Sequence, residues 1–292
     1  MNRRLIVYTL LTFALSWACW LPIIDRLEAS PFDSSPLVMG LFLLGAYGPT
    51  LMGILLTGFY DGRQGLRALA KRAVSFKVGS SWVLIAVIAG PLLYTISIAV
   101  YASLGGQLGT ANYGLLPWLP VVFIVPVVFG PLAEEFGWRG FALPLLNHKN
   151  KAISSSIIIG FIWALWHAPL FWAEAGTAIS GHTIDIAAVV LFFLAVIGSS
   201  FIYTWLFNNT AGSMFIAVLL HLSMNASGTI TGMLFPEMSS EQKLDLYEYY
   251  VVSLWALVCL GALVRRFTRA REINGAPQRV THPEVLSRAP LK

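Results

Sequence analysis

The chain has 292 residues, of which 57% are apolar and only 11% are charged, and its mean hydropathy is +0.72. A soluble domain of this length carries about a quarter charged residues, so a water-soluble globule is excluded. A membrane-crossing helix needs about 20 apolar residues, and the roughly 166 apolar residues suffice for about eight spans. We therefore expect an all-α, polytopic membrane protein. The net charge of +5 predicts no nucleic-acid partner, because the basic residues follow the membrane topology instead.

Eight long apolar runs predict eight transmembrane helices, of which the fourth is overlong and interrupted. The first run is too long for a cleaved signal peptide and has no small-residue cleavage site, so we expect it to remain as a span. Residues 1–272 are expected to form one transmembrane domain, and residues 273–292 a disordered cytoplasmic tail. The runs lie at about 5–24, 37–59, 82–104, 116–146, 153–172, 186–207, 212–235 and 249–264.

Basic residues set the expected orientation, because Lys and Arg are retained on the cytoplasmic side. With both termini inside, 16 of the 19 basic residues lie in cytoplasmic segments. The cytoplasmic segment Arg63–Lys77 has apolar residues at helical spacing and basic residues on another face. It is predicted to lie flat on the inner membrane surface, either as an ordinary loop helix or in contact with anionic lipid.

The fourth run contains three ionisable residues within six positions: Glu134, Glu135 and Arg139. Such groups at membrane depth cost at least about 2.5 kcal/mol each, so their presence calls for a reason. Glu135 and Arg139 are four residues apart, with the acid toward the N-terminus, and are expected to form a supporting ion pair. Glu134 lies about 100° further around the helix and keeps no local cation, which favours it as a general base.

Two histidines lie in other apolar runs, His167 in the fifth and His221 in the seventh. His221 and Asn225 are one helical turn apart and are expected to form a pair of donors on one face. Counting 1.5 Å per residue from the cytoplasmic helix ends places Glu134, His167 and His221 within about 7 Å of one layer. A shared site is therefore compatible with the sequence, although either histidine alone is more typical of packing, as are Trp163 and Trp166.

At these residues the sequence resembles the CPBP family, which comprises CAAX proteases and bacteriocin-processing (Abi) proteins. The pattern Glu-Glu-x-x-x-Arg is present at 134–139 and His-x-x-x-Asn at 221–225. The intervening aromatic-x-x-x-His motif has Trp163 with His167, where the family pattern has Phe. The resemblance covers about 37–235 and implies a largely helical membrane domain of eight spans.

The resemblance implies an intramembrane endopeptidase related to type II CAAX prenyl endopeptidases. Glu134, with His167, would activate a water molecule, and His221 and Asn225 would bind the oxyanion. Glu135 and Arg139 would support the site. Glu134, His167 and His221 also have the ligand types of a catalytic zinc site, so the cofactor stays open between none and a divalent metal.

Two other functions remain compatible with the same residues: a non-catalytic membrane scaffold of the same family, and a proton-coupled transporter with a relay through Glu134, His167 and His221. For an enzyme, the expected partners are the lipid bilayer and a membrane-anchored peptide or protein substrate. The expected location is a bacterial cell membrane. The substrate sequence and the oligomeric state are not encoded in a recognisable way.

Overall fold

A computed structural model describes the backbone of residues 3–147 and 151–275, and the side chains of these ranges as far as residue 264. Helices account for almost all regular structure in the described residues, which contain no β-strand. The predicted all-α class is therefore confirmed. The elements, where η marks a 3₁₀-helix except for the π-helix η5, are α1 (Arg3–Trp20), η1 (Leu21–Arg26), η2 (Pro31–Asp33), α2 (Pro36–Ala46), α3 (Gly48–Ala73), α4 (Ser80–Ser103), η3 (Tyr113–Trp118), α5 (Leu119–Ile124), η4 (Val125–Val127), α6 (Pro131–Gly137), η5 (Trp138–Ala142), α7 (Leu143–Leu146), α8 (Ala152–Trp166), η6 (Ala168–Trp172), α9 (Ile186–Asn209), α10 (Met214–Leu234) and α11 (Ser240–Gly275).

Each of the eight predicted apolar runs corresponds to one or more helices. Six of the described segments are long and apolar enough to cross a membrane. The second run forms a seventh span only if α2 and α3, which meet at a 48° bend, count together. The fifth run is the shorter apolar helix α8, of 15 residues. The protein is thus a multi-pass membrane protein.

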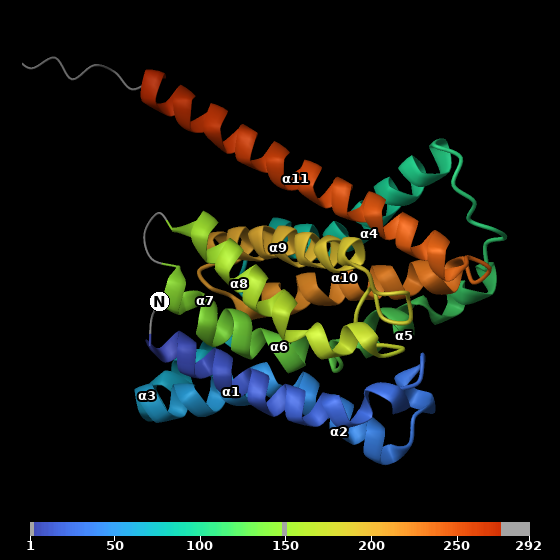
Figure 1. Ribbon diagram of the computed structural model, residues 1–292. Coiled ribbons are helices and arrows are strands. Elements are labelled where there is room, and N and C mark those ends of the chain that lie inside the picture. Colours follow the sequence, from blue (N-terminus) through green and yellow to red (C-terminus); the bar gives the residue numbers. More distant parts are fainter. Residues whose placement is uncertain (1–2, 148–150, 276–292) are drawn as a thin grey trace, which may run out of the picture.

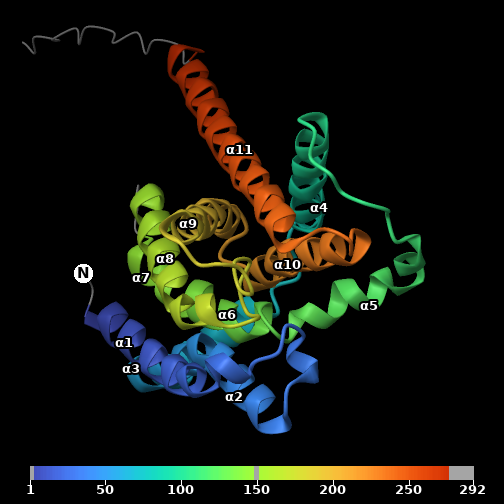
Figure 2. The same cartoon turned by 45° about the vertical axis from the view of Figure 1, so that its right-hand side comes forward.

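The helices are arranged in three groups (Figure 1). Helices α1, α2 and α3 pack together on one side, and α6, α8, α9 and α10 form the middle of the molecule. On the opposite side α11 crosses against α4 and α9, and Figure 2 shows its far end and that of α4 projecting from the body. Glu134, Glu135 and His221 lie on α6 and α10 of the middle group, whereas Arg139 lies on η5 and His167 directly follows α8.

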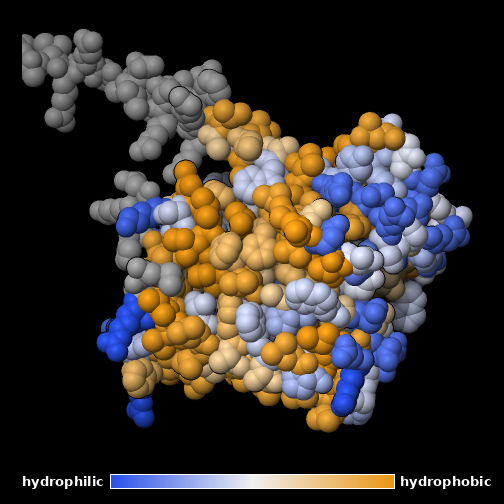
Figure 3. Space-filling model, in the orientation of Figure 1, coloured by the Kyte–Doolittle hydropathy of each residue, from blue (hydrophilic) through white to orange (hydrophobic). Residues whose placement is uncertain are grey.

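The outer surface matches a membrane environment. Figure 3 shows a broad apolar band between two hydrophilic ends on the visible face. Many large apolar side chains of the described residues are exposed, including Leu10 at 65% and Phe59 at 79%. Since a soluble protein rarely exposes so continuous an apolar surface, the band is the surface expected to contact lipid.

The fourth apolar run is broken, as its proline and glycine content predicted. Gly130 precedes α6, and Pro131 occupies the first turn, where its missing N–H costs nothing. After seven residues α6 passes into the π-helix η5 and then into α7. The tight packing of α6 against α3 depends on Gly137, where an added Cβ would lie 2.3 Å from the Pro49 carbonyl oxygen. This contact fixes the short helix that carries the two glutamates.

The cytoplasmic extension predicted at 63–77 is helical only as far as Ala73. It follows a break at Gly62, whose φ of 57° lies in the left-handed region that favours glycine. Leu69 is buried, whereas Leu66 and Val74 are exposed. Arg72 reaches back to the middle of the molecule and donates from Nη2 to the Gly140 carbonyl oxygen at 2.6 Å.

Candidate active site

Two neighbouring carboxylates on α6 each accept a hydrogen bond from the residue one turn later. Arg139 Nη1 donates to Glu135 Oε1 at 2.9 Å, and both side chains are fully buried. Trp138 Nε1 donates to Glu134 Oε2 at 3.2 Å. The predicted Glu135–Arg139 ion pair is therefore confirmed, and Glu134 is held by an indole rather than by a cation.

His221 on α10 contacts both carboxylates. Its Nδ1 lies 2.8 Å from Glu135 Oε1, and its Nε2 lies 3.9 Å from Glu134 Oε1. Glu135 Oε1 thus joins Arg139 to His221, and the imidazole is fixed in orientation by a group that is itself ion-paired. The ring is buried and packs edge-on against Trp163 and Tyr203.

Gly130 lies beside three polar side chains, those of Asn225, His221 and Glu134. A Cβ added there would be 2.8 Å from Asn225 Nδ2, 3.3 Å from His221 Nε2 and 3.8 Å from Glu134 Oε1. The α10 pair therefore points to the same place as Glu134, as predicted for His221 and Asn225. Asn225 is exposed whereas Glu134 and His221 are buried, so the site opens on the Asn225 side.

His167 directly follows α8. The α-helix does not continue, because Pro169 has no N–H to donate, and the chain passes into the 3₁₀-helix η6. Its backbone N–H bonds to Ala164, which leaves the Trp163 carbonyl oxygen free to accept from the ring Nδ1 at 2.9 Å. Because a carbonyl only accepts, Nδ1 carries the hydrogen, and the Nε2 of a neutral ring is the acceptor. Within the described residues no hydrogen bond joins His167 to Glu134 directly.

Aromatic rings cover the buried arginine. The Arg139 guanidinium carbon lies 3.7 Å from the ring centroid of Tyr203 and 4.3 Å from that of Trp163. Such cation–π contacts favour a positive charge that has lost its water. Together with the Glu135 bond, they explain how an arginine with no exposed surface is accommodated.

The described residues contain no group of three or more His, Cys, Asp or Glu side chains placed to hold one metal ion. Glu134 and His221 approach each other, but His167 does not complete a set of ligands with them. Glu134, His167 and His221 are therefore residue types that bind zinc, but their side chains are not arranged around one metal position.

Sequence reasoning missed two members of the site, Trp138 and Trp163. Trp163 Nε1 donates to Glu134 Oε2 at 2.5 Å, so this residue does more than the packing proposed for it. Trp138 could have been found, because it follows Glu134 at the same four-residue spacing as Arg139 follows Glu135. No local pattern predicts the Trp163 contact, because it joins residues 29 apart.

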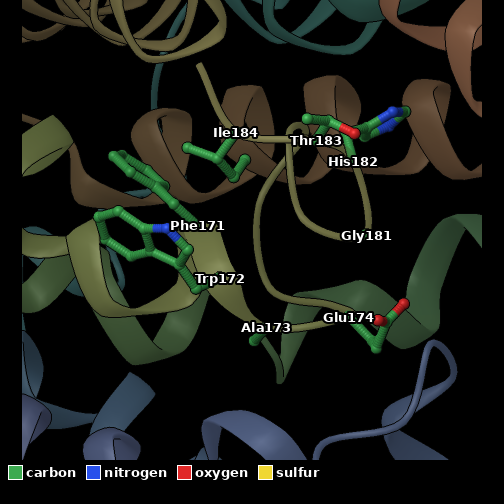
Figure 4. A pocket seen from close by; sticks show the side chains of 8 residues that line it. All are labelled: Phe171, Trp172, Ala173, Glu174, Gly181, His182, Thr183 and Ile184. Atoms are coloured by element: carbon green, nitrogen blue, oxygen red, sulfur yellow. The ribbon is translucent and has the colours of Figure 1, made fainter. Parts of the chain in front are cut away.

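A separate cavity of about 340 Å³ lies in the loop after η6. Figure 4 shows that its two ionisable residues, Glu174 and His182, lie at different ends of the cavity and do not face each other. Partial burial and the nearby Lys243 lower the pKa of His182 from its usual value. The cavity contains none of the motif residues, so we do not assign it to the candidate active site.

The chain is similar to known CAAX prenyl proteases in sequence. The family model described as type II CAAX prenyl endopeptidase Rce1-like matches residues 116–227, which include all three motifs. CAAX prenyl protease 2 of Methanococcus maripaludis is 22% identical over 225 residues, covering 75% of this chain and 82% of that protein. The chain is thus similar to CAAX prenyl endopeptidases over the region that carries all three motifs.

Proposed function

We propose that the protein is an intramembrane endopeptidase in which Glu134 activates a water molecule for attack on a peptide carbonyl. The observation that carries this proposal is the convergence of Glu134 Oε1, His221 Nε2 and Asn225 Nδ2 beside Gly130. A carboxylate oxygen can take a proton from water, and the other two groups can face the oxygen that becomes negative. Amide hydrolysis needs both functions.

The proposed reaction begins with water between Glu134 Oε1 and the substrate carbonyl carbon. Glu134 accepts one proton as the water oxygen bonds to carbon, and the carbonyl oxygen becomes an oxyanion. When the C–N bond breaks, the same proton passes from Glu134 to the departing amine. The His167 Nε2 is the second acceptor proposed to orient the water, since its Nδ1 is occupied by the Trp163 carbonyl.

The oxyanion role of His221 sets a condition on its protonation. Glu135 is ion-paired with Arg139, so as a carboxylate it accepts from His221 Nδ1. Nε2 can then donate to an oxyanion only when the ring carries a second proton. In that state Glu134, Glu135, Arg139 and His221 carry no net charge together, which favours burial of the cluster.

The proposed substrate is a membrane-anchored peptide or protein, because the site residues belong to candidate membrane spans and Asn225 among them is exposed. The archaeal relative is named as a CAAX prenyl protease. A farnesylated peptide that ends in a CAAX sequence is therefore the first substrate to test. We propose the cell membrane as the location, and no reaction step requires a metal.

The test compares cells that carry the parent protein with cells that carry Glu134→Gln, after confirming that the variant inserts and folds. The enzyme hypothesis predicts that an uncut membrane peptide accumulates in the variant. Glu174→Gln, in the outer loop, is the matched control and should leave the peptide pattern unchanged. An unchanged pattern with Glu134→Gln would favour a scaffold, and altered ion flux without new peptides would favour a transporter.

A further inference from the structure

The side chain of Glu134 has two chemically different oxygen atoms in this structure. Oε2 accepts hydrogen bonds from Trp163 Nε1 at 2.5 Å and from Trp138 Nε1 at 3.2 Å. Oε1 instead faces the space beside Gly130, where His221 Nε2 lies 3.9 Å away. The two oxygens of this carboxylate are therefore distinguished by their partners.

The two indoles are supported independently. Trp138 is fully buried and packs against Tyr8 and Trp166, with ring centroids 5.6 and 5.8 Å away. Trp163 belongs to α8, and its ring lies under the Arg139 guanidinium. Both rings donate to the same oxygen atom, Oε2. The carboxylate therefore cannot rotate without breaking a hydrogen bond to at least one ring.

Indole is suited to this task because it donates a hydrogen bond but neither accepts one nor titrates. It therefore cannot compete with Glu134 for the proton of water. Trp163 also accepts from His167 Nδ1 through its own carbonyl oxygen. One residue thus links the two groups that are proposed to act on the water molecule, which do not contact each other directly.

We propose that Trp138 and Trp163 are positioning residues, which bind Glu134 Oε2 and leave Oε1 as the oxygen that takes the proton. This inference rests on the proposed function of Glu134. It assigns Trp163 a hydrogen-bonding role that an aromatic ring without an N–H could not perform. Neither residue needs to touch the substrate for this role.

The kinetic test uses Trp163→Phe and Trp138→Phe, which keep an aromatic ring and remove the N–H. The matched control is Trp255→Phe on α11, which also removes an indole N–H, in this case one that donates to the Leu194 carbonyl oxygen at 3.0 Å. Cleavage of a farnesylated CAAX peptide is measured with purified protein, and clearance of the accumulating membrane peptide is measured in cells.

Since hydrogen bonds to charged groups are stronger than those between neutral groups, each test variant is expected to lower kcat about 10- to 100-fold. KM should change less than twofold, and the pH profile of kcat should move. Trp255→Phe should leave all three within twofold of the parent. Parental kcat in both test variants, or an equal loss in all three variants, would overturn the proposal. Either test variant suffices if the other fails to fold.

A second measurement does not depend on the substrate. In protein labelled with ¹⁵N-tryptophan, the Nε1–H signals of Trp138 and Trp163 are assigned by their loss in the Phe variants. Glu134→Gln should shift both signals, because a neutral amide accepts more weakly than a carboxylate. Unshifted signals would overturn the proposed contacts. By contrast, parental activity in Glu134→Gln would overturn the proposed function, whatever the signals show.

Discussion

Gly130 shows how closely the reacting groups approach one another. Its φ of −135° lies outside the positive-φ region that favours glycine. The new methyl group would lie 2.8 Å from Asn225 Nδ2, in the space assigned to the substrate. The absence of a side chain at Gly130 therefore leaves room between the groups of the site.

We predict that Gly130→Ala lowers kcat at least about tenfold, equivalent to the loss of roughly 1.4 kcal/mol of transition-state stabilisation. Thermal unfolding should change little, because the clash is with the end of a side chain that can move. Gly232→Ala on α10 is the control, since its Cβ would have no neighbour within 4 Å. Equal activity of the two variants would contradict the assigned position of the substrate.

Glu135 is expected to matter for folding more than for chemistry. Glu135→Gln removes the charge shared by Arg139 and His221, and breaking a buried pair in this way costs about 3 to 5 kcal/mol. The half-exposed pair of Arg4 with Asp61 gives the contrast, because surface pairs contribute about 0 to 1 kcal/mol. Folded yield and thermal unfolding of Glu135→Gln and Asp61→Asn should differ accordingly. A smaller effect in Glu135→Gln would contradict this account.

The sequence predicted those residue pairs that lie on one helix. Four-residue spacing was enough for Glu135 with Arg139 and for His221 with Asn225. It was not enough for His221 with Glu135, which are 86 residues apart and meet only through the rotation and tilt of two helices. The indole donors to Glu134 were missed for a related reason, because aromatic residues in apolar runs are most simply assigned to packing.

At the scale of elements, the site depends on how closely α10 approaches α4. A Cβ at Gly90 would lie 2.2 Å from the Ser223 carbonyl oxygen, and the Gly90 N–H donates to Ser223 Oγ at 3.1 Å. Small residues allow such close backbone approach between membrane helices. Because α10 also carries His221 and Asn225, we expect a change in this contact to move both side chains.

We predict that Gly90→Ala separates the two helices and lowers both thermal stability and kcat. The cost of forcing an extra carbon into a packed interface is about 1 to 3 kcal/mol. Gly40→Ala on α2 serves as the control, because its added Cβ has no neighbour within 4 Å. Parental stability and activity in Gly90→Ala would show that α10 does not depend on this contact.

Arg72 connects the cytoplasmic extension of α3 to the π-helix through the Gly140 carbonyl oxygen. We predict that Arg72→Gln lowers the free energy of unfolding by about 1.5 to 3 kcal/mol, because a hydrogen bond from a charged donor is lost. Arg67→Gln changes an exposed arginine of the same helix and should have little effect. Equal thermal unfolding of both variants would contradict this connection.

The elements themselves were largely predictable. Proline and glycine in the fourth run indicated that it is interrupted, and the structure divides it among six short elements. The π-helix at 138–142 was not predicted, because a one-residue expansion of a helical turn leaves the apolar pattern almost unchanged. The C-terminal end of the helix predicted at 63–77 was also wrong, because the chain leaves the helical conformation after Ala73.

At the scale of the whole molecule, composition alone predicted a multi-pass helical protein, because 57% apolar and only 11% charged residues are not typical of a soluble domain. The number of spans is less direct, since α2 and α3 form a bent pair and α8 is short. Residues 276–292 of the expected tail lie outside the described residues. The helix α11 continues to Gly275, so the first residues of the tail expected at 273–292 are helical.

The expected orientation makes a labelling prediction. In a background with Cys19 and Cys259 replaced by serine, Thr183→Cys lies in the loop expected outside and Lys77→Cys in a loop expected inside. A membrane-impermeant maleimide should label Thr183→Cys in intact cells and Lys77→Cys only after permeabilisation. The reverse pattern would contradict the orientation inferred from the basic residues.

The most direct test of the central claim is peptide cleavage in H₂¹⁸O by the parent protein and Glu134→Gln, each reconstituted in lipid vesicles. The substrate is a farnesylated CAAX peptide or the membrane peptide that accumulates in Glu134→Gln cells. The parent should release a product with one solvent-derived ¹⁸O atom in its new carboxylate. Folded Glu134→Gln should release none above background, whereas the same labelled product at the parental rate would contradict the role of Glu134.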